Sequence, residues 1–425
     1  MDSKMMHIIL ALIVGSVSSL LSIQDNRFFP WLNEPIERNY NPLTGTPWGS
    51  FYADVEGFAL HSSEATSATD GDIGLFELGG RYDLNKVAQA LESIGRPNPL
   101  KAEWRGQSIP FRLFGKLQGG GIRVLLLKDF YPLAYYYPAS YFSVGTYFQL
   151  LKTQTRLAFI FDQSNASIVV DSPETRFELE QALIQANKEL CLCDTWWNQT
   201  SFGDLDIFIR FGNHWEYPRK FKAIDFDVRL GVLAPFGHIQ DINNPASVPI
   251  AGNGHIGVYG QVDVEFELKD DLKVGAQIYL IQRFPRRGIF RAPHKDEPVN
   301  FGVIVDEFQV DPRMTFVANP YVLWQDLRDG FGLGLGYTFA THPGDIWSYV
   351  VQRPQVAARL DRVRRLSSWS SEYLSVYLMY DFARAVKAYS FAPCVRFIID
   401  APIHLLGARD VSQTIRVSMG LVFEL

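Results

Sequence analysis

The chain has 425 residues, a net charge of −6 and an isoelectric point near 5.8, and this acidic balance argues against nucleic acid as a partner. Aromatic residues reach 14%, mean hydropathy is −0.03, and no internal apolar run approaches the ~20 residues that a membrane-spanning helix needs. The three cysteines do not support a disulfide framework, because Cys191 and Cys193 are too close in sequence and Cys394 falls in a strand pattern.

The N-terminal segment has the pattern of a secretory signal. Lys4 precedes the stretch HIILALIVGSVSSLLS, whose apolar core has the length of a signal-peptide h-region and is followed by small residues. We therefore predict a signal peptide over residues 1–22. Residues 23–48 are rich in proline, asparagine and aromatics, and they are predicted to form either a periplasmic segment or a small plug.

Alternating segments between residues 49 and 163 predict five strands. The stretches QGGG and KTQTR are interpreted as the short turns of two hairpins. The first of these hairpins is weakly patterned. The tyrosine-rich stretch 131–148 is predicted to surround an outer connection, where its rings form either a membrane-interface girdle or a binding slide for sugars or apolar solutes. The five predicted strands are 49–61, 108–117, 121–129, 139–151 and 155–163.

Two helical patterns interrupt the predicted sheet. Residues 81–95 place Leu84, Val87 and Leu91 on one stripe, and residues 171–192 begin with a sequence like a capping box. Both helices fall in connections that we assign to the outside, so they are predicted either to cap the mouth of the sheet structure or to fold into its interior.

The clearest hairpin pattern lies in residues 255–284. One face of its first strand is apolar and the other carries Asp263, Glu265 and Glu267, and the second strand repeats this scheme. With KDD at 269–271 as the turn, Phe266 opposes Val274 and Glu267 opposes Lys273, so a single register satisfies both faces.

Similar hairpins follow a strict alternation of short turns and long connections. Such sorting is typical of a membrane-spanning antiparallel barrel, with tight periplasmic turns and large extracellular loops. The fold class predicted here is therefore all-β, a transmembrane barrel over residues 49–425 with about 14 strands, or 12 as the alternative, and short helices in two long loops. The further hairpins are 205–234, 314–340 and 372–400, and the long connections are 236–254, 286–312, 342–370 and 401–412.

The C-terminal strand, residues 414–425, has apolar residues at every second position up to Leu425. Its backbone is predicted to pair with both the preceding strand and the first strand, 49–61, which closes the barrel. With the signal segment and the sorted loops, the sequence resembles bacterial outer-membrane β-barrel proteins, of porin-like or long-chain-fatty-acid-transporter-like architecture. The resemblance implies a bacterial outer-membrane location, contact with outer-membrane lipid, and recognition of residues 414–425 by the barrel-insertion machinery. The last residue in that class is usually aromatic, whereas Leu425 ends this chain and Phe423 stands two places earlier.

The polar faces of the fitted strands predict a set of lumen-lining residues. Seven acids and four bases share this face, so the lumen either favours cations or is stiffened by cross-strand pairs such as Glu267 with Lys273. The predicted lumen residues are Asp204, Asp206, Arg210, Asp225, Asp227, Arg229, Asp263, Glu265, Glu267, Lys273 and Arg283.

The strand over residues 331–340 has an unusual inner face, because Gly332, Gly334 and Gly336 alternate there with apolar residues. Glycine in a strand often marks the close approach of another backbone. These glycines are therefore predicted to contact a plug or an inward loop.

These observations predict a channel or passive transporter for small solutes. The alternatives are a surface adhesin or structural protein that uses the barrel to anchor loops 62–107 and 164–202, and a soluble secreted all-β protein. No phosphate loop, metal-ligand spacing or nucleophile elbow is present, so no enzyme, cofactor or metal site is predicted. The basic runs 283–295 and 359–365 are candidate contacts for glycolipid phosphates.

Overall fold

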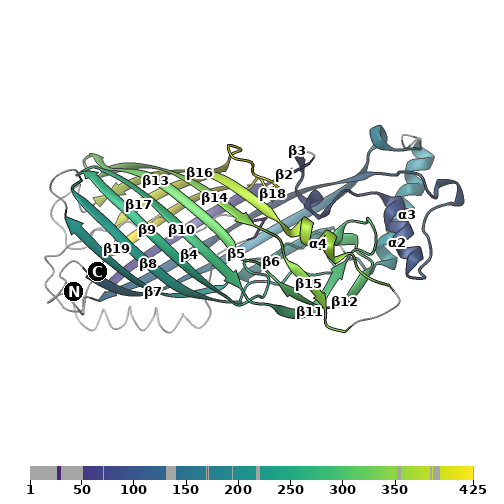
Figure 1. The fold of residues 1–425 in the computed structure, drawn as a ribbon. Helices are drawn as coiled ribbons and strands as arrows, with labels where there is room; N and C mark the ends of the chain where they lie inside the picture. Colours follow the sequence, from purple (N-terminus) through teal and green to yellow (C-terminus); the bar gives the residue numbers. More distant parts are fainter. Residues whose placement is uncertain are drawn as a thin grey trace, which may run out of the picture.

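A computed structural model gives the arrangement of the chain (Figure 1). It describes residues 26–29 and 51–424, apart from 70, 131–139, 169, 171, 194, 217–220, 352–355, 383–384 and 386–392. The predicted signal peptide and most of the 23–48 segment therefore lie outside the described residues. Among the described residues, no helix is both long enough and apolar enough to cross a bilayer.

Twelve antiparallel strands form one closed barrel, because the sheet that begins with β4 returns to it through the pairing of β4 with β5. The predicted alternative of twelve strands is thus the one found. In barrel order the strands are β1 (Phe51–Ser62), β4 (Phe111–Phe130), β5 (Ser140–Phe161), β7 (Leu205–Glu216), β8 (Ala223–Ala234), β9 (Gly257–Lys269), β10 (Leu272–Arg283), β13 (Thr315–Arg328), β14 (Phe331–His342), β16 (Trp369–Asp381), β17 (Cys394–Pro402) and β19 (Ile415–Glu424).

The count of fourteen was wrong because β4 and β5 are single strands of 20 and 22 residues. QGGG and KTQTR do not turn the chain but face each other in mid-strand, where Gln118 opposes Gln154 and Gly120 opposes Lys152. A Cβ atom on Gly121 would collide with the carbonyl oxygen of Leu150. The glycine run therefore permits close approach of two long strands.

The barrel closes between its first and last strands, as predicted. β19 pairs with β1, with Ala59 opposite Val417, and also with β17, with Ile399 opposite Val417. Both chain ends of the barrel, Phe51 and Glu424, lie at the end that carries the two short turns at 270–271 and 329–330. Short turns mark the periplasmic end, so the opposite end is extracellular.

The position of the tyrosine-rich stretch differs from the prediction. Lys128, close to the end of β4, opposes Phe51, the first residue of β1. The end of β4 and the start of β5 therefore lie at the periplasmic end and not at the outer one, and residues 131–139 between them lie outside the described part of the chain. Tyr141 and Tyr147 in β5 are buried on the inner face, so these two rings belong to the lumen and not to a lipid-facing girdle.

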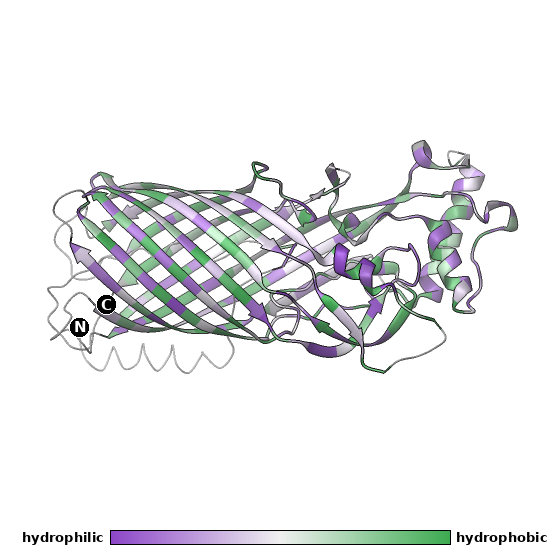
Figure 2. Cartoon of the chain, in the orientation of Figure 1, coloured by the Kyte–Doolittle hydropathy of each residue, from purple (hydrophilic) through white to green (hydrophobic). Residues whose placement is uncertain are grey.

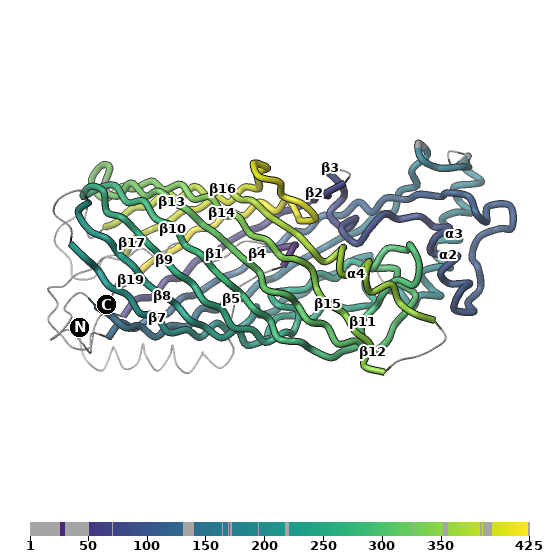
Figure 3. The backbone as a smooth tube through the Cα atoms, viewed as in Figure 1, coloured from purple at the N-terminus to yellow at the C-terminus, as the bar shows by residue number. Residues whose placement is uncertain are grey.

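The extracellular end carries most of the remaining elements (Figures 1 and 3). Both predicted helices are found, and α2 (Leu84–Ser93) and α3 (Pro173–Glu189) pack together beyond the barrel at the far end of the long β4–β5 hairpin. They cap an extension and do not enter the lumen. The other elements are β2 (Glu64–Ser67), β3 (Gly71–Gly74), η2 (Leu75–Gly79), η3 (Ala102–Trp104), η4 (Gln163–Asn165), β6 (Trp196–Phe202), β11 (Arg286–Ala292), η5 (Val299–Phe301), β12 (Ile304–Asp311), β15 (Ile346–Tyr349), α4 (Leu360–Ser367) and β18 (Val411–Ser412).

Hydropathy alternates along the barrel strands (Figure 2). The apolar side chains of this alternation are exposed and form a belt on the outside of the barrel. Ile207, Leu230, Ile278 and Met419 are between 45% and 60% exposed, and each is flanked by buried residues. A belt of exposed apolar side chains around a closed barrel is stable only when it faces lipid. The barrel is therefore membrane-embedded.

Candidate functional site

The inner face of the barrel is lined by charged side chains. Each of the eleven residues that the sequence assigns to the lumen is buried or partly buried: Asp204 lies just before β7, Asp206 and Arg210 lie in β7, Asp225, Asp227 and Arg229 in β8, Asp263, Glu265 and Glu267 in β9, and Lys273 and Arg283 in β10. In β7, for example, Asp206 and Arg210 alternate with the exposed Ile207, Ile209 and Phe211. These charged groups thus contact other protein atoms more than solvent.

Ion pairs join several of these residues across strands. Arg210 Nε lies 3.2 Å from Asp227, and Lys273 Nζ lies 2.9 Å from Glu265. The predicted register is present, since Glu267 opposes Lys273, and the Glu267 carboxylate lies 3.4 Å from Lys222 Nζ. Lys273 is thus close to Glu265, which lies two positions from the predicted partner Glu267. A long lysine side chain can reach such a diagonal neighbour.

A second group of charges, which the sequence analysis did not identify, lies on the inner side of the closing strands. We call it the seam cluster, and it joins β17, β19, β1 and β4. Arg416 Nη2 lies 2.6 Å from Asp400, Arg123 pairs with Glu56, and Arg396 pairs with Asp54. The alternation of charged with exposed residues in β1 and β17 is the signal that could have identified it. The seam cluster consists of Asp54, Glu56, Arg123, Arg396, Asp400 and Arg416.

The three glycines of β14 do face the interior. The nearest atoms to a Cβ at Gly334 or Gly336 belong to Leu323 and to Tyr377, whose ring lies over this wall. The glycines thus provide the space for a tyrosine from the neighbouring strand β16. Contact with a plug stays a prediction, because residues 30–50 lie outside the described part of the chain.

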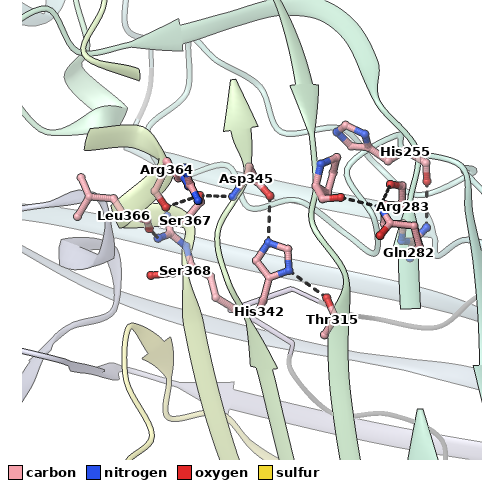
Figure 4. A network of polar contacts seen from close by, with 12 residues as sticks. His255, Gln282, Arg283, Thr315, His342, Asp345, Arg364, Leu366, Ser367 and Ser368 are labelled. Atoms are coloured by element: carbon pink, nitrogen blue, oxygen red, sulfur yellow. Dashed lines mark hydrogen bonds and ion pairs between the residues drawn. The ribbon is translucent and has the colours of Figure 1, made fainter. Parts of the chain in front are cut away.

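The connection between β8 and β9, residues 235–256, bends across the extracellular end of the barrel. Asp204 holds it in place: its carboxylate accepts hydrogen bonds from the backbone N–H groups of Gly237 at 3.2 Å and Gly252 at 3.0 Å. Arg283 Nη1 lies 2.6 Å from the same carboxylate and also donates to the backbone oxygen of His255 (Figure 4). Asp204 and Arg283 therefore act at the mouth of the barrel, where they fix an inward loop.

Under this loop lies a cavity of about 220 Å³. One part of its wall is apolar and includes the rings of Phe290, Trp347 and Trp369. The polar part of the wall includes Arg283, Arg291 and Arg313, and also the carboxylates of Asp241 and Asp345. Arg313 is exposed and has no carboxylate within ion-pair distance among the described residues. The cavity thus combines an aromatic surface with an available cation.

A hydrogen-bond network borders the cavity at the tips of β13 and β14 (Figure 4). The His342 ring lies between the Thr315 hydroxyl and the Asp345 carboxylate, with 3.0 Å on each side, and it stacks on Trp369. The Ser367 hydroxyl accepts a hydrogen bond from the Asp345 backbone N–H at 2.8 Å. The network ties α4 to the barrel rim and keeps the polar side of the cavity in a fixed geometry.

Residues 26–29, the described part of the predicted N-terminal segment, reach the same cavity. The Asn26 side-chain amide donates to the backbone oxygen of Ala251 at 3.0 Å, and the Arg27 guanidinium donates to the backbone oxygens of Leu78 and Leu366. Burial lowers the pKa of Arg27 below its usual range. These residues lie at the extracellular end, whereas Phe51 begins β1 at the periplasmic end.

Comparison with known proteins adds to this description of the fold. The sequence matches no protein-family model, and it matches no curated protein. Among solved structures, the COG4313 outer membrane channel from Pseudomonas putida F1 is similar to this chain, with 9% sequence identity and a TM-score of 0.51. The match covers 92% of this chain and 100% of the channel. Two further structures are more distant. A FadL homologue from Pseudomonas aeruginosa has 8% identity and a TM-score of 0.31, and the match covers 88% of this chain and 89% of the homologue. The toluene transporter TbuX from Ralstonia pickettii has 9% identity and a TM-score of 0.33, and the match covers 90% of each chain. The first of these likenesses supports the fold alone. Together with the closed barrel and its apolar belt, it shows that the chain is a bacterial outer-membrane β-barrel protein.

Proposed function

We propose that this protein is a passive outer-membrane channel that selects small amphipathic anions at its extracellular mouth. The observation that carries the proposal is the cavity under loop 235–256. It is lined both by aromatic rings and by an exposed arginine, Arg313, that has no carboxylate partner among the described residues. An aromatic wall binds an apolar body, and a guanidinium binds a carboxylate through charge-assisted hydrogen bonds. A solute with both parts satisfies the two surfaces at once.

The size and burial of the surrounding groups support small solutes. The cavity of about 220 Å³ lies below the ~300–1,000 Å³ that is usual for drug-sized ligands. Beneath it, the lumen-lining side chains are largely buried and joined by ion pairs, an arrangement that suits slow, selective passage better than a wide water-filled pore. Recognition at the mouth is therefore the step at which we place selectivity.

The test uses Trp347 and Trp369 as reporters, since both line the cavity. Benzoate should change the tryptophan fluorescence of the folded protein, and Arg313→Gln should weaken its affinity about tenfold, because the charged hydrogen bond is lost. The affinity for neutral benzyl alcohol should change less than twofold. Arg287→Gln is the matched control, since Arg287 is an exposed arginine of β11 that does not line the cavity.

Transport is tested separately by planar-bilayer conductance and by benzoate entry into vesicles that contain the protein. Equal benzoate affinity in the wild type and Arg313→Gln would refute selection by this cavity. Binding without any conductance or entry would refute the channel and favour a barrel that only anchors the extracellular elements.

A further inference from the structure

We propose that the outward face of the long β4–β5 hairpin binds the phosphorylated sugar headgroup of an outer-leaflet glycolipid. The site is a groove of about 710 Å³, which we call the outer groove. It lies on the side of the hairpin that faces away from the lumen, so it is separate from the mouth cavity. The residues that the argument uses are Arg112, Lys116, Arg156 and Trp196, with Lys152 below them.

The central observation is a pair of like charges in the sheet. Lys116 in β4 directly opposes Arg156 in β5, and Arg156 directly opposes Trp196 in β6. Lys116 and Arg156 are both exposed, and neither has a carboxylate within ion-pair distance among the residues that the structure describes. Like charges directly opposite each other in a sheet destabilise it unless an anion lies between them. This pair therefore has the charge that a bound phosphate would complement.

The height of the outer groove relative to the membrane identifies the source of that anion. Ile122 and Leu150 oppose each other at the upper edge of the apolar belt, 52% and 37% exposed. Beyond this row the outward residues become polar: Lys152 lies about 7 Å and Arg156 about 20 Å further along β5 than Leu150. Cations spread over such a depth match a phosphorylated oligosaccharide headgroup, whereas a phospholipid presents a single layer of phosphate.

Apolar side chains are exposed close to the extracellular ends of other strands, as Phe236, Ile256, Phe284 and Met314 show. The outward face of the β4–β5 hairpin differs from these positions in its directly opposed cations, Lys116 and Arg156. Trp196, which is 55% exposed, supplies an aromatic ring of the kind that stacks on a sugar.

Three carboxylates also line the outer groove and must be accounted for. Glu77 accepts a hydrogen bond from the Gly74 N–H and lies 3.7 Å from Arg112, and Asp72 accepts one from the Gln413 side chain at 2.7 Å. Glu64 has no cation within ion-pair distance among the described residues. The negative charge of Glu64 opposes anion binding. Removing it should therefore strengthen binding, whereas removing Lys116 and Arg156 should weaken it.

The experiment titrates the folded full-length protein, in detergent, with rough-type lipopolysaccharide, with its phosphatase-treated form and with phosphatidylglycerol. The wild type should bind the phosphorylated glycolipid at least fivefold more tightly than either other lipid. Lys116→Gln with Arg156→Gln should abolish that preference, and Glu64→Gln should strengthen binding about twofold. The control is Lys86→Gln with Arg105→Gln, which removes two exposed positive charges near the extracellular tip.

Heat-modifiable gel migration confirms that each variant is folded. Binding by the double variant equal to that of the control would overturn the proposal. So would equal affinity for the phosphatase-treated form, which would indicate contact with the apolar belt alone, or complete displacement of the glycolipid by millimolar inorganic phosphate, which would indicate a general phosphate site. Because the assay does not involve transport, its outcome is independent of the channel function proposed above.

Discussion

Gly420 in β19 makes the seam cluster possible. It lies directly between Arg396 of β17 and Glu56 of β1, and a Cβ atom there would lie 3.4 Å from Glu56 and 3.5 Å from Asp54. We expect Gly420→Ala to be tolerated and Gly420→Val to destabilise the barrel by about 1–3 kcal/mol, because its extra methyl groups would enter the space that the ion pairs use. The measurement is the temperature at which the folded band disappears in heat-modifiable gel migration.

A matched control for this variant lies on the neighbouring strand. Gly57 of β1 opposes Met419, one residue from Gly420, and a Cβ atom there would meet no atom within 4 Å. Gly57→Val should therefore change the transition temperature much less than Gly420→Val. If both valine variants lowered the transition temperature equally, Gly420 would be needed for the flexibility of its strand and not for the packing of the seam cluster.

The lumen also shows how far single residues can be assigned from sequence. The period of two identifies which side chains face inward, because a strand has only two faces. It does not identify their partners: Arg396 reaches across a whole strand to Asp54, and Asp204 turns out to hold a loop. Such partners depend on side-chain reach and on loops whose path no strand pattern specifies.

At the scale of elements, the stability of loop 235–256 is expected to depend on pH. Burial lowers the pKa of His238 and of His255 below the usual 6.5, and the His255 ring donates to the Phe284 carbonyl at 2.9 Å. A lowered pKa in the folded state contributes stability that is complete above pH 6.5 and is lost as the pH falls through the lowered value. Hydrogen exchange in residues 235–256 should therefore accelerate between pH 6.5 and pH 5, relative to the barrel strands.

The charged groups around these rings make the test specific. Arg283, Arg286 and Asp345 act on His255, and Asp241 acts on His238. Replacing both histidines with glutamine should remove the additional exchange at low pH, because glutamine does not titrate in this range. If the double variant keeps the full pH response, a carboxylate must be responsible and the histidines are not.

The strand count shows that the apolar pattern predicts the membrane-spanning part of a strand but not its full length. Hairpins with one lipid-facing surface, such as β9–β10, were predicted with their register because the apolar face fixes it. The long β4 and β5 continue well beyond the belt, where Lys116 and Arg156 replace apolar residues on the outward face. The pattern that marks a membrane strand stops there although the strand does not, so two elements were divided into four.

At the scale of the whole molecule, the decisive feature is closure between the ends of the chain. Ala59 and Val417 oppose each other, and antiparallel partners have Cα atoms within the range that a disulfide can span. With Cys191, Cys193 and Cys394 replaced by serine, Ala59→Cys with Val417→Cys should cross-link in the folded barrel, and the reduced and oxidised forms should migrate differently after boiling. Ala59→Cys with Leu421→Cys is the control, since Leu421 lies about 13 Å further along β19 and cannot bridge to residue 59. Cross-linking of the control with equal yield, or none in the first pair, would contradict the twelve-stranded barrel and with it the lumen, the mouth cavity and the outer groove, all of which depend on β1 and β19 being neighbours.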